Sequence, residues 1–375
     1  MLSAYTMPIQ TAFLFFPAIA AVLVLPVYIY QYRKFGFMNM WRLAAIYAFV
    51  LYLMCAYFLV ILPLPPTRDI ISLLGTHRQT YDLVPFSSIM DIIRETQVVP
   101  SRPSTYLHLL RERAFLQVAF NLLLTVPFGM FLRYLFRLKL GATTLITFCL
   151  TLFFETSQLT GLFGIYNAPY RLFSVDDLMQ NTLGGMLGYA LVPALLWFIP
   201  SLDSVDTKKR SEVMTRGVGV LRRCVALLID WVVLDLGIGF VNGIVRVNGV
   251  HWLITAVGIA LYFVLLPYTT RGYALGKWLV RVRLVSADGS APTLRALAVR
   301  AGVFYGTVLG INGVLSTAMN LNSENALVLV GCLLFFALVN LLLVVNFIAN
   351  IRSRSFFHDR VSGVVNSPVQ AVSQP

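Results

Sequence analysis

Apolar stretches of helical length alternate with polar joints along the whole chain. A helix that crosses the hydrocarbon core of a bilayer needs about 20 apolar residues. Nine stretches approach or exceed that length: residues 11–31, 41–62, 114–136, 142–164, 178–200, 224–244, 251–268, 294–319 and 326–348. Strands of a membrane barrel alternate apolar and polar residues, whereas these stretches are continuously apolar. The pattern therefore predicts an all-α integral membrane protein with about nine transmembrane helices.

Two polar joints are longer than the rest. Residues 201–223 separate five predicted spans from four, and we interpret them as a basic linker between membrane domains at 1–200 and 224–375. Residues 63–113 combine arginines, acidic residues and prolines, which favours short helices lying on the membrane surface. In the second half, the segment VRVRLVSADGSAP alternates in polarity and predicts a short cytoplasmic β-hairpin with its turn at the Asp-Gly pair.

Basic residues gather in every second joint. With the N-terminus outside the cell, most of the 29 Lys and Arg residues fall in cytoplasmic joints, as the positive-inside rule requires. We therefore predict an outside N-terminus and a cytoplasmic C-terminus. The first apolar run lacks a basic start and a small-residue cleavage site, so we expect a retained span rather than a signal peptide.

Composition excludes an ordinary soluble enzyme. Only 12% of the residues are charged and 58% are hydrophobic, against about a quarter and about a half in soluble domains. The net charge of +13 is explained by cytoplasmic loops that contact anionic headgroups, so the expected partners are membrane lipids and not nucleic acid. Because the four cysteines lack a CxxC pair and the four histidines are scattered, we expect no disulfide, metal or cofactor.

Polar residues inside the predicted spans mark candidate sites, because an ionisable group at the centre of a span costs about 2.5–3.5 kcal/mol. In the first half, Glu155 and Gln158 share one helical face, and Asp177 and Asn181 share another. The predicted orientation places both faces at one depth near the extracytoplasmic side. The candidate residues, for ligand binding or for structure, are Asn121, Glu155, Gln158, Arg171, Asp176, Asp177 and Asn181.

Two explanations of these residues stay open. One is a polar pocket that binds a ligand. In the other, Glu155 and Arg171 form an ion pair that joins two helices, and the amide side chains satisfy backbone groups. No nucleophile with a positioned base is visible, so we expect no catalytic residue and no enzymatic activity. The sequence Gly184-x-x-x-Gly188 in the fifth span favours close helix packing.

The second half concentrates ionisable residues near the predicted cytoplasmic side. Arg223 and Asp230 share one face of the sixth span, and Lys277 and Asp359 lie in polar segments further along the chain. These four residues either form a closed ion cluster that fixes three elements, or take part in ion coupling. Asp235 has no obvious partner in the sequence pattern, which makes it the candidate ligand for a proton or a cation.

Several motifs of the first half resemble the VanZ-like family of bacterial membrane proteins, over about residues 40–195. They are DLVPF at 82–86, NLLLTVPFG at 121–129, E-x-x-Q at 155–158 and R-x-x-S-x-D-D-x-x-x-N-T-L-G-G at 171–185. The family usually carries an acidic residue at the position of Ser174. The resemblance implies low-level resistance to glycopeptide antibiotics such as teicoplanin, and the family has no agreed enzymatic activity.

The second half resembles the RDD family over about residues 216–367. That family is named for one arginine and two aspartates, which Arg223, Asp230 and Asp359 match. The G-x-x-x-G-K element at 272–277 and the downstream Arg300 also fit. The resemblance implies a membrane location and a transport role, and some members have been proposed as cation/proton antiporters.

These observations favour a multi-pass protein of the bacterial plasma membrane that binds an envelope ligand in an outward-facing pocket. The expected ligand is a glycopeptide or a lipid-linked cell-wall precursor, and the expected role is teicoplanin-type resistance. The alternative is a secondary transporter that couples ions through membrane carboxylates. An enzyme acting on lipid or peptidoglycan precursors would need a catalytic constellation that is not visible. We also expect the second half to modulate or anchor the first without sharing its ligand.

Overall fold

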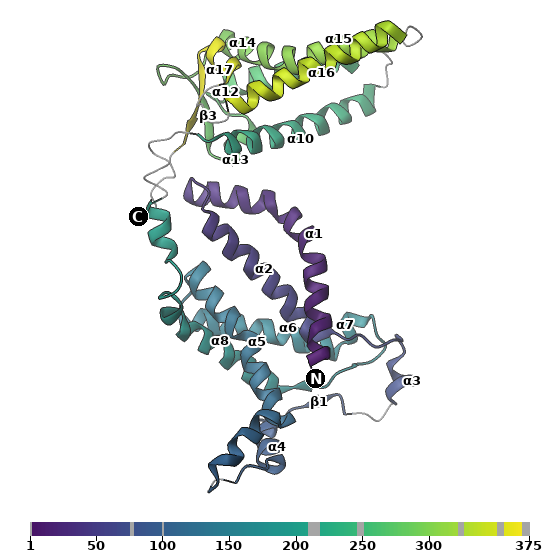
Figure 1. Cartoon of the computed structure of the whole chain (residues 1–375), viewed down its shortest axis with the longest axis vertical. Coiled ribbons are helices and arrows are strands. Elements are labelled where there is room, and N and C mark those ends of the chain that lie inside the picture. The colour runs from purple at the N-terminus through teal and green to yellow at the C-terminus, as the bar shows by residue number, and fades with distance from the viewer. Residues whose placement is uncertain are drawn as a thin grey trace. The chain divides into compact units, whose positions relative to one another are not determined.

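The computed structural model describes residues 2–75, 79–99, 101–208, 218–245, 251–321, 326–350 and 356–369. The chain divides into two compact units (Figure 1). The first unit comprises Met1–Val24 and Asn39–Thr207, and the second comprises Leu25–Met38 and Lys208–Pro375. The division falls inside the linker that the sequence predicts, whose residues 209–217 lie outside the described part of the chain.

Eight of the described helical segments are long and apolar enough to cross a membrane. They are α1 (Leu2–Phe35), α2 (Met40–Ile61), α5 (Arg113–Phe136), α6 (Leu140–Leu159), α10 (Val220–Val245), the run of α11, η2 and α12 (His251–Ala260, Leu261–Leu265 and Leu266–Thr269), the run of α14, η3 and α15 (Leu294–Tyr305, Gly306–Gly310 and Ile311–Leu321) and α16 (Ala326–Ala349). Each coincides with a predicted span, and the all-α membrane fold is confirmed. The orientation of the helices stays a prediction.

The remaining predicted span, residues 178–200, forms the helix α8 (Val175–Leu195), which is not among those eight. Its sequence is less apolar, because Asp176, Asp177 and Asn181 lie near its start and three glycines lie in its middle. Asp176, Asn181 and the three glycines are buried. Neighbouring helices therefore surround the polar face of α8.

Helix α8 packs against α5 with the two backbones in close contact, and it also packs against α6. A Cβ atom on Gly184 would collide with the Leu122 carbonyl oxygen of α5, and one on Gly188 would collide with the next turn of the same helix. A Cβ atom on Gly185 would collide with the side chain of Thr147 on α6. The predicted small-residue face is confirmed, and it allows polar groups from three helices to meet.

Short elements fill the joint between α2 and α5, as predicted. They are α3 (Ile70–Leu74), β1 (Tyr81–Asp82), α4 (Ser87–Glu95) and η1 (Pro103–Arg111). Helix α6 is followed by α7 (Gly161–Gly164) and then by β2 (Phe173–Ser174), which directly precedes α8. Strand β1 pairs in parallel with β2, so the joint is held at the N-terminal end of α8. The location of the short helices on the membrane surface stays a prediction.

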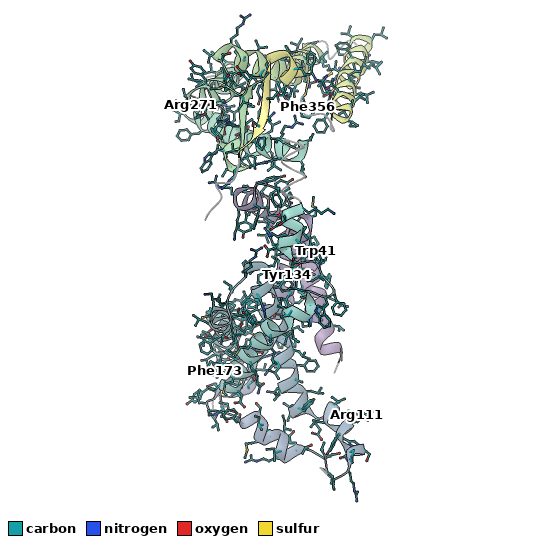
Figure 2. The ribbon with its side chains drawn as sticks, turned by 90° about the vertical axis from the view of Figure 1, so that its left-hand side faces the viewer. Trp41, Arg111, Tyr134, Phe173, Arg271 and Phe356 are labelled. Atoms are coloured by element: carbon teal, nitrogen blue, oxygen red, sulfur yellow. The ribbon has the colours of Figure 1, made fainter. Side chains whose placement is uncertain are left out.

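Aromatic side chains connect the helices at the other end of α5. The Trp41 indole N–H donates to the Tyr134 hydroxyl at 2.6 Å, and that hydroxyl donates to the Pro200 carbonyl at 2.7 Å (Figure 2). Beside them, the buried Arg42 forms a salt bridge with Asp206. Trp and Tyr are typical of the boundary between bilayer and water. This end of the first unit therefore has the chemistry of a membrane interface.

Two short helices and two strands accompany the spans of the second unit: α13 (Leu275–Leu279) and β3 (Val282–Ser286) lie between spans, and α17 (Phe357–Ser362) and β4 (Val364–Pro368) follow the last one. The predicted hairpin is wrong in its pairing, because β3 pairs antiparallel with β4 along its whole length. The Asp-Gly turn does form, with Gly289 at φ +84°. Soon after the turn, Pro292 lacks a backbone N–H for pairing with β3, and Leu294 already begins α14. The strand that pairs with β3 is therefore β4, from the far end of the chain.

The second unit also contains residues 25–38, which include the last part of α1 and which the sequence pattern assigned to the first domain. Tyr28 and Tyr32 pack in one apolar core with Val280. The Arg222 guanidinium lies 4.6 Å from the centre of the Tyr32 ring. Aromatic packing and a cation–π contact thus hold this segment in the second unit.

Candidate functional site

The candidate residues of the first unit surround the ends of α5, α6 and α8, and we call them the Glu155 cluster: Asn121, Glu155, Gln158, Arg171, Asp176, Asp177 and Asn181. Glu155 lies near the end of α6 and is only 3% exposed. Its carboxylate accepts a hydrogen bond from the backbone N–H of Ser174 at 3.0 Å. Ser174 is the last residue of β2, so the β1–β2 pairing sets the position of this donor.

Asn121 connects α5 to the first turns of α8. Its amide nitrogen donates to the Asp177 carboxylate at 2.7 Å and to the Gln180 side-chain oxygen at 3.0 Å. Asp177 and Asn121 are both half-buried. Asn121 thus lies against the start of α8, whereas the depth of these polar groups in the membrane stays a prediction.

Asp176 does not bind the same groups as Asp177, because it caps the short helix α4. Its carboxylate accepts hydrogen bonds from the backbone N–H groups of Phe86 at 2.6 Å and Ser88 at 2.7 Å. The Ser87 hydroxyl bridges Asp176, at 3.3 Å, and Asp82, at 2.9 Å. A carboxylate at a helix N-terminus satisfies free N–H groups and the positive end of the helix dipole. Asp82 and Ser87 are thus part of the cluster, although sequence reasoning did not select them.

Arg171 and Gln158 do not pair with Glu155. Both cap the end of α2: the Gln158 amide donates to the Val60 carbonyl at 2.9 Å, and the Arg171 guanidinium donates to the Leu62 carbonyl at 3.0 Å. The described residues form no salt bridge between Arg171 and Glu155. The ion pair expected between Glu155 and Arg171 is therefore absent from the described residues. The second part of that explanation, an amide side chain that satisfies a backbone group, holds for Gln158.

A buried polar stripe on α6 continues from Glu155. Thr143, Thr147 and Thr151 are fully buried at intervals of four residues, and the Asn181 amide of α8 donates to the Thr151 hydroxyl at 3.1 Å. The side-chain oxygen of Asn181 has no hydrogen-bond partner among the described residues. Sequence reasoning missed these threonines, although their spacing with Glu155 places all four on one helical face.

In the second unit, Asp230 is the centre of the first of two ion pairs. It is fully buried and accepts hydrogen bonds from the Gly276 backbone at 2.6 Å and the Tyr262 hydroxyl at 2.9 Å. The Lys277 ammonium lies 3.4 Å from its other oxygen. Burial lowers the pKa of Lys277, and the Asp230 carboxylate acts against that shift. A Cβ atom on Gly276 would collide with the Ala226 carbonyl, so only glycine permits this approach.

Asp359 is the centre of the second ion pair. The Arg300 guanidinium lies 2.9 Å from one oxygen and the Arg223 guanidinium 3.5 Å from the other. Burial lowers the pKa of the adjacent His358 to about 4, so this side chain is neutral at pH 7. The predicted cluster therefore contains two ion pairs, and they lie close enough together for Arg300 and Asp359 to act on the pKa of Lys277. Arg223 pairs with Asp359 instead of Asp230, and Arg300, which was absent from the candidate residues, completes the second group.

Asp235, the candidate ion ligand, joins neither group. It is exposed on α10, and no hydrogen bond or ion pair connects it to another described residue. Within the described part of the chain, three or more His, Cys, Asp or Glu side chains do not gather in a geometry that could hold a metal ion.

Two family models match the chain. Residues 49–198 match the VanZ/LLP1 family, and residues 218–363 match the RDD family. No match was found among curated proteins or among solved structures. The first match contains the whole Glu155 cluster, and the second contains both ion pairs of the second unit.

Proposed function

Because this multi-pass membrane protein joins an N-terminal VanZ/LLP1 region to a C-terminal RDD region, we propose that it acts in the bacterial plasma membrane by binding an envelope ligand at the Glu155 cluster. The ligand is a glycopeptide or a lipid-linked cell-wall precursor. Its binding contributes to resistance against glycopeptides of the teicoplanin type. We assign binding and not catalysis to the cluster, since Glu155 accepts a backbone N–H and Asp177 accepts a side-chain amide.

The proposal rests on one observation: the mostly buried Glu155 cluster contains more carboxylate side chains than cationic side chains. Glu155 accepts a backbone N–H, and Asp177 accepts the amide of Asn121. Neither forms a salt bridge with another described residue. The Arg171 guanidinium acts on both carboxylates, but its hydrogen bond goes to the Leu62 carbonyl. A buried carboxylate that lacks a directly bonded cation is costly to ionise. A ligand with amine or amide N–H groups would donate hydrogen bonds to these carboxylates. Relief of the cost of their burial would then contribute to the affinity for the ligand.

The test is antibiotic susceptibility in a deletion strain. We expect the wild-type gene to restore teicoplanin resistance and the Glu155→Gln variant to leave the strain as sensitive as the deletion, because the variant keeps the shape of the side chain and removes its charge. Glu95→Gln is the matched control, since Glu95 is exposed at the end of α4 in the same unit. Membrane abundance of each variant is measured by immunoblot. Full resistance with Glu155→Gln at equal abundance would contradict the proposal.

A secondary transporter is the second candidate function, and one observation favours it. Asp235 is exposed within a helix long enough to cross the membrane, without a partner among the described residues. Ionisable residues in such positions commonly belong to ion pathways. The two closed ion pairs around Asp230 and Asp359 do not favour it, because both carboxylates already face cations.

A further inference from the structure

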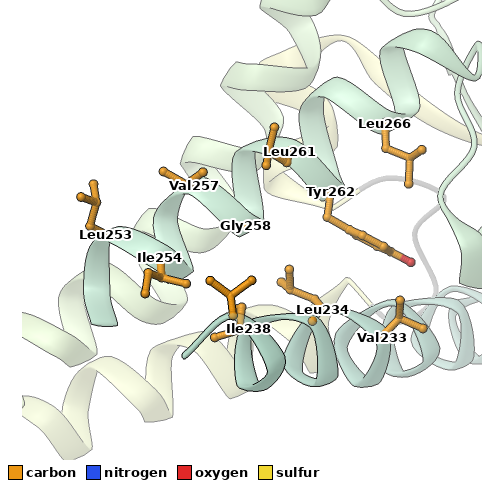
Figure 3. A pocket seen from close by; sticks show the side chains of 12 residues that line it. Val233, Leu234, Ile238, Leu253, Ile254, Val257, Gly258, Leu261, Tyr262 and Leu266 are labelled. Carbon is orange, nitrogen blue, oxygen red and sulfur yellow. The ribbon is translucent and has the colours of Figure 1, made fainter. Parts of the chain in front are cut away.

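The second unit contains an apolar groove of about 620 Å³ between α10 and the run of α11, η2 and α12 (Figure 3). Leu234 and Ile238 belong to one wall, and Val257 and Leu261 belong to the other. Of the side chains that line the groove, only that of Tyr262 carries a polar atom. Both walls belong to helices long and apolar enough to cross a membrane, so we expect the groove to face lipid chains.

Two glycines line the groove, one on each wall. On α10, the position that a Cβ of Gly237 would occupy has no other atom within 4 Å. On the opposite wall, a Cβ on Gly258 would lie 3.3 Å from the Leu234 side chain, so a larger residue would narrow the groove. At one end, η2 is a turn of π-helix, a feature that is frequent at functional sites.

The groove has the length of a lipid chain. It extends from Leu253 to Leu266, which is about 20 Å at the helical rise of about 1.5 Å per residue. Half of the hydrocarbon core of a bilayer is about 15 Å thick. A single hydrocarbon chain therefore fits along the groove, with the rest of the molecule outside it.

Positive charge marks the end of the groove beyond Leu266. Arg271 follows α12, and Arg283 lies on β3; both are exposed and form no salt bridge with the described residues. They are neighbours, because the Leu284 backbone N–H donates to the Gly272 carbonyl at 2.8 Å. Guanidinium groups bind phosphate through paired hydrogen bonds. A chain seated in the groove would thus have its phosphate within the field of two arginines.

We propose that this groove is a binding site for an anionic phospholipid, with one acyl chain between α10 and α11–α12 and the phosphate at Arg271 and Arg283. Lipid tails are as apolar as the walls of the groove, so contacts with the chain alone give little selectivity. Arg271 and Arg283 supply the selectivity for an anionic headgroup. The site is independent of the Glu155 cluster, and its failure would leave the proposed resistance function untouched.

The experiment counts lipids bound to the purified full-length protein by native mass spectrometry during titration. The probes are dipalmitoyl phosphatidylglycerol and the phosphatidylcholine with the same chains. We expect the wild type to bind phosphatidylglycerol about tenfold more tightly. Gly237→Leu fills the groove and is expected to abolish that binding. Gly239→Leu is the matched control: it lies on the same helix, also faces open space and does not line the groove.

A second variant keeps the test decisive if Gly237→Leu does not fold. Replacing both Arg271 and Arg283 by Gln changes only exposed side chains, and we expect it to remove the preference for phosphatidylglycerol while the chain still binds. Wild-type binding of phosphatidylglycerol by Gly237→Leu would overturn the proposal. So would an unchanged lipid preference in the double arginine variant, or equal binding of the two lipids by the wild type.

Discussion

Asp176 and Asp177 are adjacent in the chain but belong to different parts of the first unit. Asp176 holds the N-terminus of α4, whereas Asp177 accepts the amide of Asn121 on α5. Consecutive positions at the start of a helix point about 100° apart, so one Asp-Asp pair can serve a loop and a helix packing face together. Substitutions of the two residues should therefore have different consequences.

At the residue scale, Asp235 gives the sharpest prediction for the transporter alternative. That alternative predicts that Asp235→Asn reduces proton-coupled cation flux into vesicles to background, because the amide cannot exchange a proton or balance a cation. Asp288→Asn, at an exposed turn outside the spans, is the control and should transport as the wild type does. Unchanged flux with Asp235→Asn would exclude Asp235 from ion coupling.

Helical spacing predicted which residues of one element act together, but not their partners on other elements. It grouped Asn121, Glu155 and Asp177, and the structure places Asn121 in contact with Asp177. It could not show that Asp176 binds the backbone N–H of Phe86, 90 residues earlier in the chain, at the start of α4, since a spacing rule covers only one helix. The same limit explains why the four residues Arg223, Asp230, Lys277 and Asp359 were grouped together, but the pairing of Arg223 with Asp359 was not predicted.

At the element scale, the packing of α8 against α5 predicts an unusual sensitivity to a single methyl group. We expect Gly188→Ala to destabilise the protein by about 1–3 kcal/mol, because its Cβ would overlap the α5 backbone. Gly141→Ala, in open space at the start of α6, should instead be neutral or stabilising by up to about 1 kcal/mol. Thermal unfolding in detergent measures both, and equal melting temperatures would contradict the packing argument.

Hydrophobic length alone predicted most of the membrane helices, and it failed where other forces decide. Helix α8 was predicted from its apolar residues, yet its polar face is buried among helices and its glycines set the packing. The π-turns η2 and η3 left no signal in the apolar pattern, because a π-turn adds one residue without changing polarity. Strand β3 was predicted, but its partner β4 depends on contacts between distant segments.

For the whole molecule, the predicted orientation can be tested with single cysteines in a background where the four native cysteines are replaced. Ser101→Cys lies in the joint between α2 and α5, and Ser290→Cys lies in the turn after β3; both positions are exposed. We expect a membrane-impermeant thiol reagent to label the first in intact cells and the second only after lysis, because the basic joints belong to the cytoplasm. Labelling of both cysteines in intact cells would contradict the predicted orientation.

The cap at Asp176 also has a consequence for biosynthesis. Ribosomes deliver the chain from its N-terminus, so Phe86 and Ser88 emerge long before the carboxylate that they bind. Until α8 has been translated and inserted, the first turn of α4 lacks this acceptor and the joint lacks its anchor. The loop that completes the candidate site can therefore mature only after α8, so the assembled site shows that α8 has reached its place.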